Sequence, residues 1–114
     1  MRLSAHVIPN VEGIKRLMIH ETEMGVYLFC FNRVPDGGGM GDEWYETVAD
    51  AKAAAQEAYQ VSSDAWTQIA DPYEYCQQDW IQPVRVKGRN LGQPEWGKLE
   101  RLVDGHWLAF DPEE

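Results

Sequence analysis

The sequence predicts an α+β domain, in which a mostly antiparallel sheet carries one main helix packed on one of its faces. Three observations lead to this fold class. Segments rich in strand-forming residues alternate with turn residues in both halves of the chain. Only one segment has a clear helical spacing of apolar residues, and Asp104-Gly105 is a strong signal for a β-hairpin. The expected order of elements is β-β-β-α-β-β-β.

The first β-hairpin is expected over residues 14–31. Residues 14–20 are rich in strand formers, and residues 21–25 supply a polar turn that ends in glycine. Residues 26–31 follow, with apolar character at every position. A strand of this kind is typical of the interior of a sheet, where both faces are covered. We therefore expect residues 26–31 to lie mid-sheet.

A glycine-rich loop is expected at residues 35–41, because four glycines in five positions are costly in either a helix or a strand. A phosphate-binding loop would need a Gly-Lys-Ser or Gly-Lys-Thr sequence after the glycines. The next residues are instead Asp42 and Glu43, whose charges repel phosphate. The segment therefore indicates a linker, followed by a short strand at residues 43–46.

The main helix is expected from Val48 to about Tyr59. Thr47 is the predicted N-cap, and Asp50 three positions later makes a variant of the capping box. Apolar residues recur at helical spacing along one stripe, most of them alanine, so the helix can approach a sheet closely. The stripe consists of Val48, Ala51, Ala55, Ala58 and Tyr59.

After the helix, the sequence predicts one short helical turn and one strand. Ser62 or Ser63 is expected to cap the turn, and Pro72 to close it. The strand is expected over residues 80–87. Pro83 has no N–H to donate to a neighbouring strand, so this strand should be at an edge or bulged.

The last hairpin is expected to pair residues 99–103 with residues 106–110 around Asp104-Gly105. We expect one domain over residues 1–114, with a flexible arm at residues 1–12 and a frayed tail at residues 111–114. The hydrophobic content of 44% and charged content of 25% are typical of a globular chain with one packed core.

The net charge of −9 is concentrated in the middle of the chain. Residues 42–79 hold nine acids and a single base, Lys52. Binding to a nucleic-acid backbone is disfavoured, because its affinity comes from lysine and arginine. A basic protein is the favoured charged partner.

Neither a cofactor nor a metal is expected. Cys30 and Cys76 are not in a Cys-x-x-Cys spacing, and the three histidines, His6, His20 and His106, have no helical ligand spacing. The chain has neither an apolar run of the ~18 residues that a membrane span needs nor the apolar core of a signal peptide. We expect a cytoplasmic protein of bacterial type with reduced thiols and no Cys30–Cys76 disulfide.

The segment Gly41-Asp42-Glu43-Trp44-Tyr45-Glu46-Thr47, followed by Asp50-Ala51 and Ala54-Ala55, resembles a family of small bacterial proteins with a domain of unknown function. In that family an Asp-x-Trp strand leads into a Thr-capped, alanine-rich helix, and a turn like Asp64-Ala65-Trp66 follows. The resemblance covers residues 26–66 and implies the fold rather than an activity. Tyr45 stands where the family pattern has histidine, so the resemblance implies no histidine chemistry here.

The leading hypothesis for function is a non-enzymatic protein-binding module, of the immunity or antitoxin kind, whose acidic helix face engages a basic partner. We expect no catalytic residues, because Cys30 is interpreted as a core residue and acids near Cys76 suppress its thiolate. The candidate partner-binding residues are Asp42, Glu43, Asp50, Glu57, Asp64, Trp80 and Trp96.

Three alternatives stay open. The acidic face can serve solubility alone. The chain can be an enzyme or small-ligand binder with a pocket between the sheet and the glycine-rich loop; a lining of Trp44, Tyr45, His106 and an acid would favour it. Trp80 and Trp96 also border the basic cluster Arg85, Lys87 and Arg89, and such a combination can bind single-stranded nucleic acid.

Overall fold

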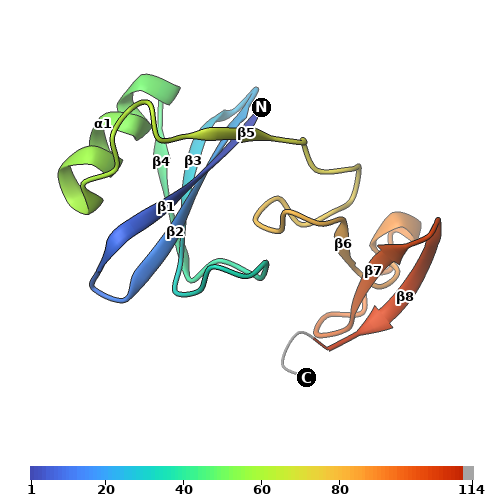
Figure 1. Ribbon diagram of the computed structural model, residues 1–114. Helices are drawn as coiled ribbons and strands as arrows, with labels where there is room; N and C mark the ends of the chain where they lie inside the picture. The colour runs from blue at the N-terminus through green and yellow to red at the C-terminus, as the bar shows by residue number, and fades with distance from the viewer. Residues whose placement is uncertain (112–114) are drawn as a thin grey trace. The chain divides into compact units, whose positions relative to one another are not determined.

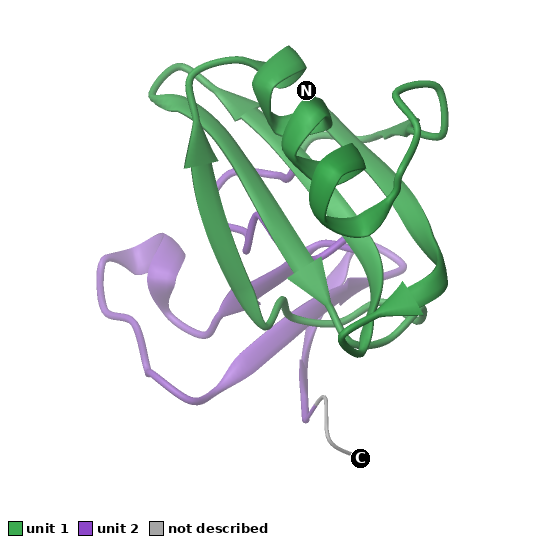
Figure 2. Ribbon diagram, turned by 90° about the vertical axis from the view of Figure 1, so that its left-hand side faces the viewer, with its two compact units in different colours: residues 1–71 green, residues 72–114 purple. Residues whose placement is uncertain are grey.

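The computed structural model describes residues 1–111, which form two compact units (Figures 1 and 2). The first unit spans residues 1–71, and the second begins at residue 72. Within the described residues there are two antiparallel sheets and one α-helix, so the predicted α+β class is confirmed. The single domain expected over residues 1–114 stays a prediction. The frayed tail expected at residues 111–114 lies outside the described residues, except for Asp111.

The first unit is built on a five-stranded sheet with the order β4-β3-β2-β1-β5. The strands are β1 (Arg2–Val11), β2 (Ile14–Thr22), β3 (Gly25–Phe31), β4 (Gly41–Tyr45) and β5 (Thr67–Ile69). The predicted first hairpin is confirmed, with Thr22 opposite Gly25 at its turn. As expected, β3 is an interior strand, because it pairs with β2 on one side and β4 on the other.

Residues 1–12 do not form the expected flexible arm. Residues 2–11 form β1, which pairs with β2 and with β5. The physical reason is an alternation in this strand, where Leu3, Ala5 and Val7 are buried and contribute to the core. Apolar residues at every second position are typical of a strand with one face on a core.

The expected helical turn after Ser62 or Ser63 is also absent from the described residues. Residues 67–69 form β5, which pairs with residues 2–4 of β1 at the edge of the sheet. The backbone groups along that edge of β1 would otherwise have no strand partner. Pairing with a distant strand therefore overrides the local capping signal.

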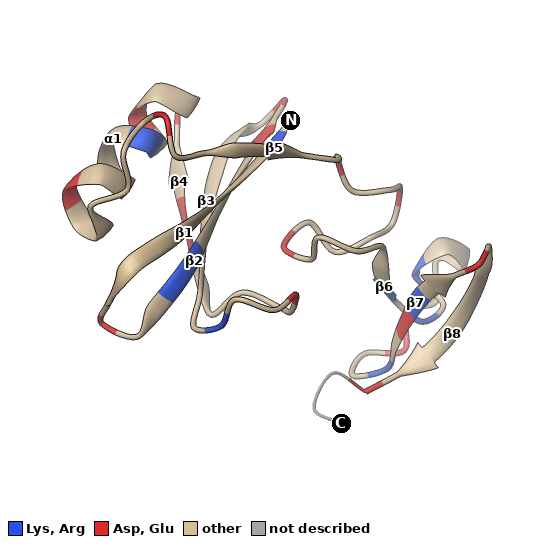
Figure 3. Cartoon of the chain, viewed as in Figure 1, with Lys and Arg blue, Asp and Glu red and all other residues tan. Residues whose placement is uncertain are grey.

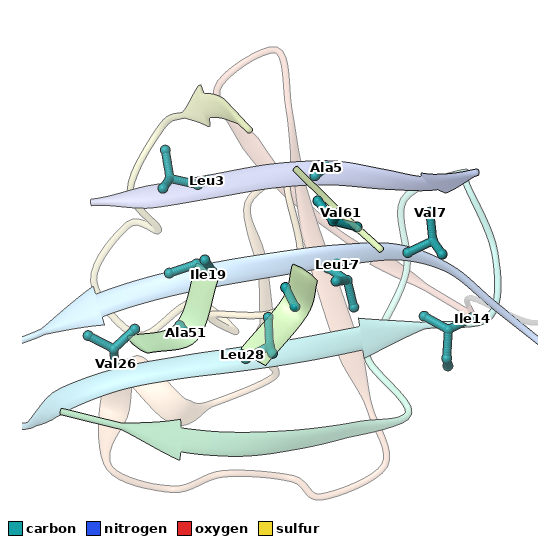
Figure 4. Packing of buried hydrophobic residues seen from close by; sticks show 11 residues of the cluster. Leu3, Ala5, Val7, Ile14, Leu17, Ile19, Val26, Leu28, Ala51 and Val61 are labelled. Carbon is teal, nitrogen blue, oxygen red and sulfur yellow. The ribbon is translucent and has the colours of Figure 1, made fainter. Parts of the chain in front are cut away.

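The helix α1 extends from Val48 to Tyr59 as predicted. The Thr47 hydroxyl caps it by accepting a hydrogen bond from the Asp50 amide at 3.1 Å. Ala51 (Figure 4) and Ala55 are fully buried in the core beneath the helix. Ala58, expected in the same stripe, is exposed, and Val61 beyond the helix is buried in the core.

The helix covers one face of the sheet, and the core lies between them. Its members come from three strands, from α1 and from the segment just after α1. They are Leu3, Ala5, Val7, Ile14, Leu17, Ile19, Val26, Leu28, Ala51, Ala55 and Val61.

The opposite face of the sheet has a different character, with two buried arginines. The guanidinium of Arg16 lies 3.8 Å from the ring centroid of Phe31, its cross-strand neighbour. Arg2 donates from Nε to the carbonyl of Ala70 at 2.7 Å. A cation over an aromatic face is favourable when both are removed from water.

The second unit contains a three-stranded sheet with the order β6-β7-β8. Its strands are β6 (Val84–Val86), β7 (Leu99–Val103) and β8 (His106–Phe110). The predicted hairpin is confirmed, with Asp104 and Gly105 both at positive φ as a tight two-residue turn requires. The strand expected over residues 80–87 is shorter than predicted, and it lies at the sheet edge as Pro83 indicates.

A short 3₁₀ helix, η1 (Arg89–Leu91), lies in the loop between β6 and β7. Among residues 1–111, no helix combines the length and apolar character that crossing a membrane requires.

The close approach of α1 to the sheet gives a test of this packing. Replacing Ala55 with leucine should lower the free energy of unfolding by about 1–3 kcal/mol, because three additional carbons have no space beneath the helix. The matched control is Ala53→Leu at an exposed position of the same helix, which should change stability by less than about 0.5 kcal/mol. Urea denaturation compares the two. Equal stabilities would contradict the packing.

Candidate functional site

The five acids singled out by sequence are all exposed, in the first unit. Asp42 and Glu43 lie on the edge strand β4, Asp50 and Glu57 on α1, and Asp64 in the loop before β5 (Figure 3). Within residues 1–111, none of them makes an ion pair. The nearby base, Lys52, donates instead to the Ser63 carbonyl at 3.4 Å. Their negative charge is therefore uncompensated.

The structure does not place all five acids on one face. Asp42 and Glu43 are adjacent in a strand, so their side chains lie on opposite faces of the sheet. Asp50 and Glu57 are seven residues apart and lie along the same side of α1. Asp64 accepts a hydrogen bond from the Ser62 hydroxyl, which lowers the pKa of its carboxyl. Glu43 and the helix acids are thus separate parts of an acidic region.

A recess of about 170 Å³ lies beside Glu43, on the helix-facing side of the sheet. The strand register produces it: Leu28 pairs with Glu43, and Cys30 pairs with Gly41. Because Gly41 has no side chain, the space next to Cys30 stays unfilled. The lining residues are Leu28, Cys30, Gly41, Asp42, Glu43 and Tyr59, the last residue of α1.

Hydrogen bonding fixes Glu43 at the recess. The Tyr45 hydroxyl donates to Glu43 Oε2 at 2.5 Å, and this bond, together with burial and the carboxylate charge, raises the pKa of Tyr45 to about 12. The neutral phenol is the form that can donate, so the bond persists at neutral pH.

The other titratable groups of the recess are held neutral. Burial is the main cause that raises the pKa of the Cys30 thiol, and the charges of Glu43 and Asp42 raise it further. Burial also raises the pKa of Tyr59. At neutral pH the recess therefore presents a protonated thiol and a neutral phenol beside Glu43, and Cys30 is not an activated nucleophile.

Sequence reasoning missed this recess. The sequence predicts Cys30 as a core residue, and Cys30 does pack against the core, but it is only partly buried and its Sγ lies 3.6 Å from the Gly41 carbonyl. The expected pocket lining also differs, since Trp44, Tyr45 and His106 do not line the recess. The signal that could have found it is the glycine at residue 41, where a strand begins beside an acidic pair.

Trp44 supports the edge strand from the hairpin turn. Its indole N–H donates to the Met24 carbonyl at 3.1 Å, and a Cβ at Gly25 would lie 2.1 Å from Nε1. Gly25 also has a φ of +124°, so this turn requires glycine. The ring nevertheless remains 53% exposed.

The two tryptophans of the candidate set lie in the second unit and differ in exposure. Trp96 is 76% exposed. Trp80 is partly buried and meets the Phe110 ring edge-on at 5.6 Å, so it offers less of its ring to a partner than Trp96 does. Large aromatic rings that find a partner ring are stabilised there.

Two members of the basic cluster beside these tryptophans, Arg85 and Arg89, already interact with other side chains of the protein. Arg85 Nε bonds Glu100 Oε1 at 3.1 Å, and the Arg85 guanidinium lies 3.8 Å from the Trp107 centroid. Arg89 donates to Gln77 Oε1 at 2.9 Å. An arginine that already neutralises a carboxylate adds little attraction for a phosphate, so the cluster offers weak support for nucleic-acid binding.

Among residues 1–111 there is no group of three or more histidines, cysteines and acids arranged to hold a metal ion. Neither Cys30 nor Cys76 forms a disulfide among the described residues.

Comparison of the chain with protein-family models, with curated proteins and with solved structures finds no match. The resemblance to small bacterial proteins with a domain of unknown function therefore stays a prediction.

The Tyr45–Glu43 bond predicts a pH effect. Glu43→Gln keeps a hydrogen-bond acceptor but removes the charge, so the pKa of Tyr45 should fall from about 12 toward the ordinary 10. Because the folded pKa is the higher one, the stabilisation from this bond is complete below pH 10 and disappears as the pH rises through 12. Ultraviolet titration of tyrosinate measures the shift. Glu46→Gln is the control and should leave the titration curve unchanged; an unchanged curve for Glu43→Gln would contradict the bond.

Proposed function

We propose that the protein is a non-enzymatic binding module that engages a basic protein partner through the acidic region of its first unit. The observation that carries this proposal is the exposure of Asp42, Glu43, Asp50, Glu57 and Asp64 without an ion pair among the described residues. The proposal includes a cytoplasmic location in a bacterial cell and a role of the immunity or antitoxin kind.

The physical basis is long-range attraction. Residues 42–71 carry seven acids and one base, a net charge of −6, whereas residues 1–41 are balanced by four of each. A field of one sign accelerates the encounter with an oppositely charged surface and orients it. Exposed charges contribute less to the lifetime of the complex, because water and salt screen them.

Two competing interpretations use the same residues. Acids on a small protein keep it soluble, and acids on an edge strand such as β4 also discourage pairing with other chains. Under either interpretation the acids act through repulsion, and no basic partner is needed. The interpretations differ in what reversing the charges would do.

A small-ligand binder or enzyme is the second candidate, and the recess beside Glu43 is the observation in its favour. It is smaller than the ~300–1,000 Å³ typical of pockets for drug-sized ligands. Its thiol and phenol have raised pKa values, so they are poor nucleophiles or bases at neutral pH. The binding module is therefore the function that the geometry supports better.

The proposal predicts that partner binding depends on the helix acids and on salt. An Asp50→Lys, Glu57→Lys double variant should lose most partner recovery in a pull-down at ~50 mM salt, and the wild type should lose most of it at ~500 mM. Association should slow far more than release accelerates. The matched control is Glu21→Lys, Glu23→Lys, which reverses two exposed acids at the β2–β3 turn.

Equal recovery by the wild type and the double variant at both salt levels would exclude the acidic region as the binding surface. If the Glu21→Lys, Glu23→Lys control also loses partner recovery, binding depends on the net charge of the protein rather than on the positions of these acids. Circular dichroism of each variant establishes that α1 has remained folded, since lysine at Asp50 is unfavourable in the first helical turn.

A further inference from the structure

The recess beside Glu43 combines features that a long cationic side chain needs. Leu28, which is buried, supplies an apolar surface, and the ring of Tyr59 borders the same space. Glu43 places an anionic group beside them, held by the Tyr45 hydroxyl. A side chain with an aliphatic stem and a charged tip buries the stem on apolar surface and keeps the tip at the polar edge.

The size of the recess limits the occupant. A volume of about 170 Å³ corresponds to roughly six waters at ~30 Å³ each. A lysine side chain has five heavy atoms beyond Cα, so it fits, whereas a nucleotide or a cofactor does not. An anionic occupant is disfavoured, because the Glu43 side chain borders the recess, Asp42 on the opposite face adds a second negative charge nearby, and the neighbouring thiol and phenol are neutral.

The hydrogen bonding at Glu43 favours lysine over arginine. Arginine binds a carboxylate best through two parallel bonds, one to each oxygen. Oε2 of Glu43 already accepts the short hydrogen bond from Tyr45, so it is less available for the second of the two bonds that arginine would make. The ammonium group of lysine is a compact charge that can approach a single oxygen.

We propose that this recess binds one lysine side chain of the basic partner, with the stem against Leu28 and Tyr59 and the ammonium group at Glu43. This inference rests on the proposed function and adds a specific contact to it. It requires that the partner surface carries a protruding lysine. The remaining acids attract the partner but do not fix the position of any one of its side chains.

The recess exists because Gly41 has no side chain, so a substitution at Gly41 can fill it. A Cβ added at Gly41 would meet Cys30 Sγ at 3.9 Å, an ordinary contact, and its φ is outside the left-handed region. Valine is therefore compatible with the backbone here and is a favourable residue in a strand. Gly41→Val should fill the recess without unfolding the edge strand.

Cys30 provides the measurement, because its thiol lines the recess and an occupant shields it. In a Cys76→Ser background, the alkylation rate of Cys30 by iodoacetamide is measured with three acetylated, amidated pentapeptides: Gly-Gly-Lys-Gly-Gly and its arginine and norleucine equivalents. A single side chain should bind with a Kd on the order of 1 mM. At ten times that concentration the lysine peptide should slow alkylation about tenfold.

Two variants and a control decide the outcome. Glu43→Gln should abolish the protection by the lysine peptide, and Glu46→Gln, a matched change outside the recess, should retain it. Equal protection by the lysine and norleucine peptides, or no protection by either, would overturn the proposal. Stronger protection by the arginine peptide would overturn the choice of lysine.

The partner assay separates this inference from the proposed function. Gly41→Val should reduce partner recovery at ~50 mM salt by about tenfold or more. A loss of affinity of this size is expected when one buried ion pair of a complex cannot form. One outcome would overturn the recess proposal and retain the proposed function: full partner recovery by the Gly41→Val variant, together with loss of partner recovery by the Asp50→Lys, Glu57→Lys double variant. Protection of Cys30 by lysine together with unchanged recovery in all variants would retain the recess and overturn the proposed function.

Discussion

The pairing of β4 with β3 is the contact on which both the core and the candidate site depend. In this register Val26 and Leu28 lie opposite Tyr45 and Glu43, on the face that α1 covers. A slip by one residue would exchange the two faces of β4, because side chains alternate along a strand. Glu43 would then leave the recess, and Trp44 would turn toward the helix.

Several local features hold β4 in this register. Trp44 donates to the Met24 carbonyl across the hairpin turn, where only glycine fits at residue 25. At the other end of the strand, the Met40 amide bonds the Cys30 carbonyl at 2.8 Å. The Thr47 cap follows two residues after β4, so the strand also determines where α1 begins and hence where Ala51 and Ala55 meet the sheet.

Local patterns predicted most of the elements. The stripe of alanines, the Thr47 cap and the Asp104-Gly105 turn each depend on a few neighbouring residues, and all three were identified from the sequence. The pairing of β5 with β1 was not, because it joins residues more than sixty positions apart and replaces a plausible local cap. The extent of β1 was missed because its alternation is short and is flanked by polar and proline residues.

The candidate site was predicted only in part, for the same reason. The exposed acids are a matter of composition and could be named from the sequence. The recess arises from one cross-strand pair, Cys30 opposite Gly41, and from Tyr59 at the far end of α1. No spacing along the chain reveals that these residues meet. A glycine in a strand often marks a place where something approaches closely, and here it marks an unfilled space.

We propose above all that the uncompensated acids of the first unit attract a basic partner. The most direct measurement is the association rate constant of the wild-type chain with its isolated partner as the ionic strength rises from ~0.02 to ~0.5 M, over which the screening length falls from roughly 20 to 4 Å. We expect the association rate constant to fall steeply while the dissociation rate constant changes little. An association rate that is independent of ionic strength would contradict the claim.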